Sequence, residues 1–334
     1  MSEKPLIAIV GGTGFIGFSL AKRLIKKFRI RILDVKSPRQ RISRVEFVRC
    51  DIRNYEEVRS SLKGADLVIH TAIIQIPTIN EQKQLAYNVN FIGTYNVCDV
   101  VYMDRNIKGM ILAGTWHTVG EKELKGVIDE EFGFRPDKVE NRARLYALSK
   151  IAQESIIRFY DEMSEKTFGI IRMGTVLGEG MPEKTAASIF IENGLKGKPI
   201  TPYKHSMYRP MLYVDIDDVC KAYENFAMKI LNDKHWKGRD SLSHVVNVYY
   251  PKPITVLDLA EAIREAIRRL TDYKVNPEIM IVDKGLRMMF SNGDEKRIKV
   301  DVSKALRMLG FKNLRSPYES VEKIVKQRLA RSRK

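Results

Sequence analysis

The sequence predicts an α/β protein with a doubly wound parallel sheet and a smaller, discontinuous α/β cap. Short apolar runs alternate with longer amphipathic stretches through the first half of the chain, which is the pattern of βαβ units. A glycine-rich turn follows the first apolar run directly. After Gly174 the regular alternation of apolar and amphipathic stretches gives way to a Lys-rich segment that is punctuated by Pro and Gly. We therefore expect a sheet-forming domain over residues 1–174. Residues 175–334 form mainly the cap, with segments that return to the first domain.

The apolar runs of the first half mark the expected strands, because strands buried on both faces read as nearly continuous hydrophobic segments. They lie at residues 5–10, 29–34, 45–50, 64–72, 109–114 and 168–174. Helices are expected where apolar side chains recur with the helical period. These stretches are residues 14–27, 81–104 and 145–163.

The second half begins with a Lys-rich segment over residues 175–215 that is punctuated by Pro and Gly. Periodicity then predicts a helix around residues 216–231, a strand at 244–249, a helix at about 256–270 and a C-terminal helix after Tyr318. The last residues, KQRLARSRK, are interpreted as a basic helix end or frayed terminus.

Composition limits the classes of protein that the chain can be. Hydrophobic residues make up 44% of its 334 residues and charged residues 30%, which excludes a disordered or peptide-sized scaffold. The 58 Lys and Arg against 41 Asp and Glu give a net charge of +17, so the surface field favours anionic partners. No stretch approaches the roughly 18 to 20 apolar residues of a membrane span. We expect a protein without a membrane segment.

The cysteines and histidines are scattered rather than paired. Cys50, Cys98 and Cys220 lie far apart, with no spacing of a zinc or redox motif, which predicts a reduced, cytoplasmic location. The five histidines are equally dispersed, so no metal site is expected.

The segment VGGTGFIG places Gly11, Gly14 and Gly17 between the first strand and its helix. A tight turn, close backbone approach and a helix N-terminus are what a bound pyrophosphate requires. The context therefore predicts a Rossmann-type dinucleotide site. Phe15 and Ile16 lie between the last two glycines and belong to the same expected cofactor loop.

Asp34 ends the second strand, where a carboxylate accepts hydrogen bonds from the adenosine ribose and repels a 2′-phosphate. NAD is therefore expected in preference to NADP. Lys36, Arg39 and Arg41 follow closely and would weaken that preference if they faced the cofactor, although a solvated basic loop is the favoured interpretation.

Tyr146 and Lys150 stand at positions i and i+4 of an expected helix, so both side chains project from one face. A tyrosine near pKa 10 is a poor base at neutral pH, and an adjacent ammonium favours its phenolate. Such a pair supports proton transfer, but the spacing is informative only beside the glycine loop.

Together, the glycine loop, Asp34 and the Tyr-Lys pair resemble the extended short-chain dehydrogenase/reductase family, in particular its NAD-dependent epimerase/dehydratase branch of UDP-glucose 4-epimerase-like enzymes. The resemblance implies that Asp51 and Ile52 contact the adenine and that the segment HTA, ending at Ala72, runs beneath the cofactor. In NFIGT it makes Asn90 an organising residue of the cofactor site, with an ordinary buried amide as the alternative.

The resemblance also places Thr115, counted back from Gly120, at the family's catalytic Ser/Thr position, which completes a triad with Tyr146 and Lys150. Trp116 and His117 follow, where 4,6-dehydratases of the family carry an Asp-Glu pair, so water elimination is disfavoured. His117 is interpreted either as a titratable group toward the substrate or as a packing residue.

The later segments resemble the nucleotide-sugar branch of the family. Thr175 stands where its enzymes usually have Asn, which removes an amide donor, and Arg209 resembles the arginine that meets the substrate diphosphate. Residues 247–263 look like the strand, loop and helix of the nucleotide-sugar cap, and residues 301–311 like a packing helix.

The resemblance implies an NAD-dependent nucleotide-sugar epimerase, with NAD and a nucleotide sugar as its ligands. The alternative is an NAD-dependent dehydrogenase or reductase of a non-nucleotide alcohol or ketone, which Thr175 favours. A non-catalytic, RNA-binding protein with an NAD fold is motivated only by the charge, and the complete triad disfavours it. The family also suggests a homodimer through the two helices at residues 81–104 and 145–163.

Overall fold

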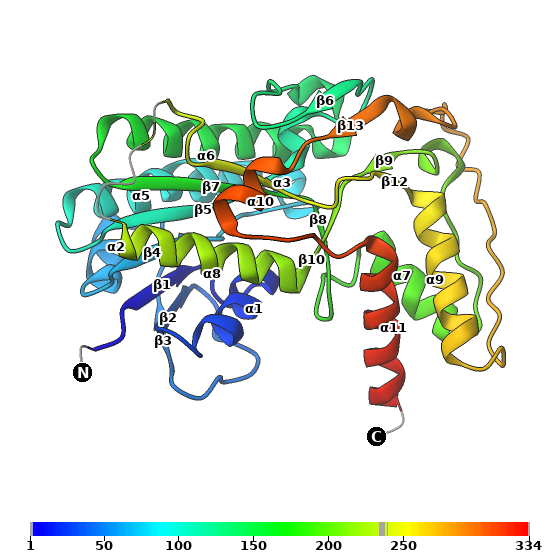
Figure 1. Ribbon diagram of the computed structural model, residues 1–334, viewed down its shortest axis with the longest axis horizontal. Helices are drawn as coiled ribbons and strands as arrows, with labels where there is room; N and C mark the ends of the chain where they lie inside the picture. Colours follow the sequence, from blue (N-terminus) through cyan, green and yellow to red (C-terminus); the bar gives the residue numbers. More distant parts are fainter. Residues whose placement is uncertain (1–2, 234–237, 239, 333–334) are drawn as a thin grey trace.

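The computed structural model describes residues 3–233, 238 and 240–332, and its centre is a seven-stranded parallel sheet (Figure 1). The strand order is β11-β7-β5-β4-β1-β2-β3. The strands are β1 (Leu6–Val10), β2 (Arg29–Asp34), β3 (Val45–Arg49), β4 (Leu67–His70), β5 (Gly109–Thr115), β7 (Thr167–Met173) and β11 (Val245–Val248). The order reverses between β1 and β4, which opens a crevice at their carboxyl ends. The expected doubly wound sheet with smaller accessory elements is confirmed.

Helices cover both faces of this sheet, as its buried strands require. On one face α1 (Phe15–Leu24) packs beside α8 (Ile216–Asn232), and on the other α2 (Tyr55–Leu62) and α6 (Arg144–Met163) flank α5 (Thr94–Met103). The alternation of strand side chains separates two cores. Ile7 and Ile9 of β1 belong to the first core, whereas Ala8 and Val10 belong to the second.

The stretch predicted as one long helix at residues 81–104 is interrupted. It consists of α3 (Thr78–Glu81), α4 (Lys83–Tyr87), a π-helical turn at Asn88–Gly93 and α5. The wider turn contains the buried side chain of Asn90 and brings Gly93 against Ile52, where an added Cβ would lie only 2.5 Å from the Ile52 side chain. Hydrophobic periodicity alone does not detect such a turn, because the pattern continues through it.

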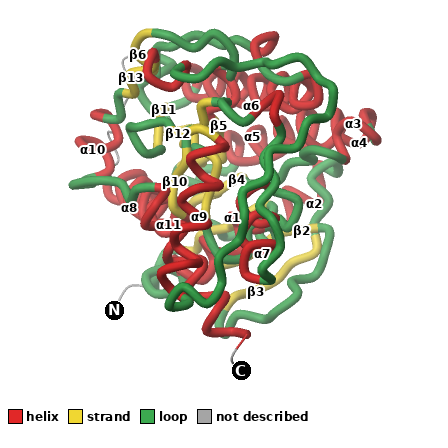
Figure 2. The backbone as a smooth tube through the Cα atoms, turned by 90° about the vertical axis from the view of Figure 1, so that its right-hand side faces the viewer, coloured by secondary structure: helices red, strands yellow, loops and turns green. Residues whose placement is uncertain are grey.

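The cap is built from small sheets and helices (Figure 2). Strand pairs β8 (Thr175–Leu177) with β10 (Tyr213–Asp215) and β6 (Gly126–Ile128) with β13 (Ile298–Val300) are parallel, and β9 (Pro210–Met211) with β12 (Ile254–Thr255) is antiparallel. Helices α7 (Ala186–Leu195) and α11 (Pro317–Ser332) pack against α9 (Val256–Leu270). The short helix α10 (Ser303–Leu309) lies near β11. None of the described helices is long and apolar enough to cross a membrane.

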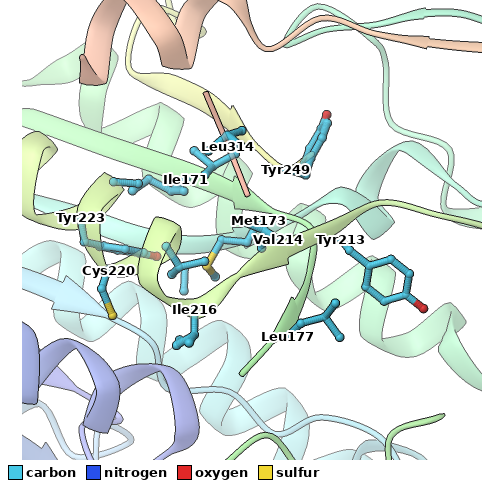
Figure 3. Close-up of a cluster of buried hydrophobic side chains, with 14 of the residues drawn as sticks. Ile171, Met173, Leu177, Tyr213, Val214, Ile216, Cys220, Tyr223, Tyr249 and Leu314 are labelled. Carbon is cyan, nitrogen blue, oxygen red and sulfur yellow. The ribbon is translucent and has the colours of Figure 1, made fainter. Parts of the chain in front are cut away.

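A shared hydrophobic cluster joins the cap to the sheet (Figure 3). Ile171 and Met173 come from β7 of the main sheet, whereas Val214 and Ile216 come from β10 and the start of α8. All four side chains are buried, so the first strands of the cap are fixed against the carboxyl end of the main sheet.

Candidate functional site

The glycine loop joins β1 to α1 at the carboxyl edge of the sheet. Gly11 has φ +77°, and a Cβ there would lie 2.5 Å from the backbone nitrogen of Ala72. A Cβ on Gly17 would lie 2.5 Å from the carbonyl oxygen of Gly11. Both positions therefore exclude larger residues. Helix α1 begins after Gly14, with no side-chain cap and no acidic residue in its first turn, so its N-terminus is free to receive an anion.

Asp34 meets this loop from the end of β2. Its carboxylate accepts hydrogen bonds from the backbone N–H groups of Thr13 and Lys36, each at 3.2 Å. The basic residues that follow, Lys36, Arg39 and Arg41, are exposed, in agreement with a solvated loop. Thus the structure brings Gly11, Gly14, Asp34 and Ala72 to one edge of three adjacent strands.

The other residues expected at the cofactor surround this loop. Phe15 reaches toward the cap, because a Cβ added to Gly178 would lie 3.4 Å from its ring. Ile16 is partly buried in the first turn of α1. Beyond β3, Ile52 is buried and Asp51 accepts a 2.9 Å hydrogen bond from Arg53 Nε, and hydrogen bonding to Arg53 is the main reason that the pKa of Asp51 is lowered.

Asn90 holds the loop after β4 to helix α6. Its side-chain oxygen accepts a hydrogen bond from Ile74 N–H at 2.8 Å, and its amide nitrogen donates to Ile74 O at 3.0 Å and to Ser149 Oγ at 3.2 Å. These contacts occupy the amide with protein partners. An organising role therefore fits its geometry better than direct contact with a ligand.

The candidate triad lies at the carboxyl end of β5. Thr115 is the last residue of β5, and Tyr146 and Lys150 are one turn apart in α6. Lys150 Nζ donates to the carbonyl oxygen of Ala113 at 2.7 Å, and burial lowers the pKa of this lysine to about 7. Burial of the phenol raises the pKa of Tyr146 to about 12, whereas its hydrogen bond with the Thr115 side chain acts in the opposite direction.

A row of polar side chains extends from Thr115. Its Oγ1 lies 3.1 Å from His117 Nδ1, and His117 Nε2 lies 3.2 Å from Glu121 Oε1. Sequence reasoning missed Glu121. The signal was available, because a carboxylate four residues after a histidine is close enough to pair with it in a short helical turn.

Arg209 lies at the far end of this row and is bound by carboxylates. Its Nη1 is 2.5 Å from Glu140 Oε1 and 3.9 Å from Glu121 Oε2. The buried Glu121 also accepts a hydrogen bond from the backbone N–H of Glu140 at 3.3 Å. A diphosphate at Arg209 would have to compete with both glutamates. No local pattern in the sequence indicates that Glu140 contacts Arg209 and Glu121.

Thr175 stands at the start of β8 and contacts the segment that follows β5. Its hydroxyl accepts a hydrogen bond from the indole nitrogen of the buried Trp116 at 3.2 Å. The position at which the family usually has Asn therefore contacts another residue that departs from the dehydratase pattern. Both differences from the family pattern, at Thr175 and at Trp116, therefore belong to one hydrogen bond.

A cavity of about 580 Å³ adjoins the acidic end of the row. It is lined by Glu121, Glu123, Leu124, Lys125, Phe132, Arg135, Pro210, Phe290, Asp294 and Arg297. Charged groups of both signs and two phenyl rings thus surround the space. Within the described ranges, no cluster of three or more His, Cys, Asp or Glu side chains is arranged to hold a metal ion.

Comparison of the sequence with known proteins identifies a matching family and several relatives. The family model described as the NAD dependent epimerase/dehydratase family matches residues 7–237. A protein of Methanocaldococcus jannaschii named "Putative UDP-glucose 4-epimerase" is 28% identical over 96% of this chain and 97% of its own length. The sterol-4-alpha-carboxylate 3-dehydrogenase (decarboxylating) of Bos taurus is 27% identical over 57% of this chain and 51% of its own length.

Solved structures share the whole architecture. The UDP-glucose 4-epimerase of Thermus thermophilus, in complex with NAD, superimposes with a TM-score of 0.74 at 21% identity, covering 96% of this chain and 98% of that one. The Thermotoga maritima UDP-glucose 4-epimerase with UDP-glucose gives a TM-score of 0.75 at 21% identity, covering 98% and 99%. At this level of identity, the likeness shows the fold.

Proposed function

The chain belongs to the NAD-dependent epimerase/dehydratase family, and from this premise we propose that it is an NAD-dependent, 4-epimerase-like enzyme acting on nucleotide sugars. The observation that carries the proposal is the position of Thr115, Tyr146 and Lys150 at the carboxyl end of β5, in the same sheet edge as the glycine loop. An isomerase is favoured over a net oxidoreductase because the full-length relative and the superimposed structures bear epimerase names.

The residues present fit NAD. Gly11 and Gly17 keep the loop free of side chains that would fill its turn, and the uncapped start of α1 offers backbone N–H groups to a pyrophosphate. Asp34 presents its carboxylate where adenosine ribose hydroxyls bind in such folds. Bound here, NAD would supply the hydride acceptor and donor that inversion at a sugar carbon requires.

The chain's own residues manage the proton and the position of the sugar. Tyr146 takes the proton of the reacting hydroxyl and gives it back. Lys150 lies one turn away, where its ammonium would stabilise the phenolate and would hold the nicotinamide ribose. Thr115 hydrogen-bonds the same substrate oxygen. Asn90 holds α6, which carries Tyr146, to the loop after β4.

Two features define the substrate within this proposal. Trp116 and His117 replace the carboxylates of the 4,6-dehydratases, so the sugar keeps its 6-hydroxyl. Arg209 is proposed to bind the diphosphate once it is released from Glu140, with Thr175 and His117 lining the sugar side.

Truncation of Arg209 to Ala should then weaken UDP binding and leave uridine binding unchanged. Equal effects on both ligands would remove Arg209 from the site.

The decisive experiment identifies the cofactor and the reaction together. Mass spectrometry of small molecules released from the purified protein should detect NAD, and NMR of a nucleotide-sugar panel should show inversion at one carbon.

Tyr146→Phe should abolish turnover with little change in NAD affinity, because the phenol carries the proton but not the cofactor. Retention of more than about a tenth of wild-type activity would exclude Tyr146 as the base, since such groups contribute about 10² to 10⁴-fold.

A dehydrogenase of a non-nucleotide alcohol or ketone is the second candidate. The carboxylates around Arg209 and the sequence similarity to a sterol dehydrogenase over about half of its length favour this candidate. Retention of cofactor discriminates between the two functions. An epimerase recycles tightly held NAD during turnover, whereas a dehydrogenase accumulates NADH in proportion to product.

A further inference from the structure

The hydroxyl of Thr115 is hydrogen-bonded to an imidazole that is itself held by a buried carboxylate. The distances are 3.1 Å from Thr115 Oγ1 to His117 Nδ1 and 3.2 Å from His117 Nε2 to Glu121 Oε1. Only 1% of the Glu121 side chain is exposed, whereas 22% of the His117 side chain is exposed. Hydroxyl, imidazole and carboxylate thus follow one another from the reaction centre toward the interior, with the ring in contact with solvent.

The local fold fixes the imidazole ring. A 3-10 turn, Trp116–Val119, begins directly after β5, and the Thr115 side chain caps it by accepting the backbone N–H of His117 at 3.4 Å. The ring centroid lies 4.6 Å from that of Trp116 and 5.8 Å from that of Tyr146, which it meets edge to face. Contacts on several sides therefore limit rotation of the imidazole.

Glu121 determines which ring nitrogen carries the proton. Burial would raise the pKa of Glu121, but the hydrogen bond to His117, together with Arg209 and the backbone N–H of Glu140, outweighs burial and holds that pKa at about 2. A carboxylate accepts hydrogen bonds and cannot donate them. His117 Nε2 must therefore carry a proton, which leaves Nδ1 of the neutral ring free to accept the hydroxyl proton of Thr115.

From this geometry we propose that His117 and Glu121 are positioning residues that set whether the Thr115 hydroxyl donates or accepts a hydrogen bond at the reacting oxygen. A neutral His117 accepts from Thr115, whose lone pairs then face the site. A protonated His117 donates to Thr115 and turns the hydroxyl proton toward the site. This proposal rests on the proposed function, because it requires a substrate oxygen beside Thr115.

In both halves of an epimerisation the reacting oxygen can only accept a hydrogen bond from Thr115. The single proton of the substrate hydroxyl goes to Tyr146 in the first half, and the ketone that forms has no proton to donate. The state in which His117 donates to Thr115 is therefore the one that presents a hydroxyl proton to the reacting oxygen. The charged and titratable groups near the ring are Glu121 from its own segment, Tyr146 and Lys150 from α6, and Arg209 and Glu140 beyond Glu121.

Nitrogen NMR of the histidine rings tests the tautomer without any substrate. In the wild-type chain, labelled with ¹⁵N-histidine, the neutral His117 ring should carry its proton on Nε2 alone. Glu121→Ala should mix the two tautomers, while Glu123→Gln, an exposed position two residues later, should leave the spectrum unchanged. A proton on Nδ1 in the wild type, or a tautomer that Glu121→Ala does not alter, would overturn the proposal.

Kinetics then test the action on Thr115. His117→Phe keeps a ring but removes both nitrogens, and should lower kcat by about 10- to 100-fold with little change in KM, less than loss of a direct oxyanion donor. His117→Asn keeps an amide that can donate a hydrogen bond to Thr115, so it should recover most of kcat. Equal kcat for wild type and His117→Phe would refute the role of His117. Activity in Tyr146→Phe would instead refute the proposed function, so the two failures are distinguishable.

Discussion

Lys150 is a cation that the fold buries at considerable cost. Only 4% of the residue is exposed, and its ammonium donates to the carbonyl oxygen of Ala113 rather than to a carboxylate. Burial lowers the pKa of Lys150 to about 7, and burial together with the charge of Lys150 lowers the pKa of His70 to about 3. The free protein therefore holds a lysine that gains or loses its proton near neutrality, and only the protonated form can stabilise a neighbouring phenolate.

Lys150→Met should change the dependence of stability on pH. The pKa of Lys150 in the folded state lies below that of an unfolded lysine, about 10.4. Between the two values the unfolded chain binds more protons, so wild-type stability rises with pH, and below pH 7 the penalty of the buried charge is fully present. From pH 7 to 9 the free energy of unfolding of the wild type should rise, relative to that of Lys150→Met, by on the order of 1 kcal/mol per pH unit.

Urea denaturation without added cofactor measures this difference, with Lys312→Met as an exposed control. If the difference in free energy of unfolding between the wild type and Lys150→Met stays constant from pH 7 to 9, Lys150 is not buried as a titrating group.

Asp34 should set the cofactor preference. A 2′-phosphate would meet the carboxylate that Thr13 and Lys36 N–H groups hold at the end of β2. We expect tighter binding of NAD than of NADP in calorimetry, and a smaller difference in Asp34→Asn, which removes the charge but keeps an acceptor. Tighter binding of NADP to the wild type would contradict the assignment.

The residues of the site were predictable where they lie in short motifs and hidden where distant segments meet. The glycines and the Tyr146-Lys150 pair stand out in the sequence, because one turn or one helix determines their geometry. Glu140 contacts Arg209 across 69 residues, and no local pattern contains that pairing. Glu121 is an intermediate case, since it lies near His117 in sequence but its surroundings include Arg209 and Glu140.

At the scale of elements, helix α6 carries Tyr146 and Lys150 and is joined to the sheet by a buried ion pair. Arg172 of β7 places Nη2 2.6 Å from Glu154 Oε1 and donates through Nη1 to Glu130 O at 2.9 Å. Nearly all of both side chains is buried. The pair aligns the helix with the neighbouring strand, and so positions the triad relative to β5.

Glu154→Gln should destabilise the protein by about 3 to 5 kcal/mol, because it leaves the Arg172 guanidinium buried without its counter-charge. Urea unfolding at neutral pH measures the loss. Glu162→Gln, at an exposed position of the same helix, serves as the control and should change stability by less than about 0.5 kcal/mol. Equal stabilities of the two variants would show that the pair contributes little.

Most elements were predictable from periodicity, and the exceptions have physical reasons. Residues 29–34 form β2 as expected, because a turn precedes this apolar run and a bend follows it. Helix α7 lies inside the Lys-rich segment that is punctuated by Pro and Gly, where no helix was predicted. Thr185 caps this short helix, which ends at Leu195. Strand β11 pairs with β7 and thereby completes the main sheet, a long-range choice that a local pattern does not encode.

At the scale of the whole molecule, one face carries an apolar surface that the described chain leaves uncovered. Tyr95 and Met103 of α5 are exposed, as are Leu148, Phe159 and Met163 of α6. The two helices pack side by side, so their exposed side chains form a surface over adjacent elements. Apolar patches of this kind usually mark contacts between proteins, which supports the proposed homodimer.

We expect Phe159→Glu to prevent dimerisation through this surface, because it places a charge where 69% of the phenylalanine is exposed. Light scattering after size-exclusion chromatography reports the molar mass. Tyr273→Glu alters an exposed aromatic residue of the cap and should leave the mass unchanged. A monomeric wild type would refute this arrangement.

The hydrogen bond between Trp116 and Thr175 gives the protein an optical reporter. The chain has two tryptophans, and Trp236 lies outside the described residues. Substitution of Trp236 by Phe would leave the buried Trp116 as the sole source of indole fluorescence, with its ring centroid 4.6 Å from that of His117 and its nitrogen bonded to the cap. Because a protonated imidazole quenches a neighbouring indole, emission intensity would follow the charge of His117. The emission wavelength would respond to any movement of the cap.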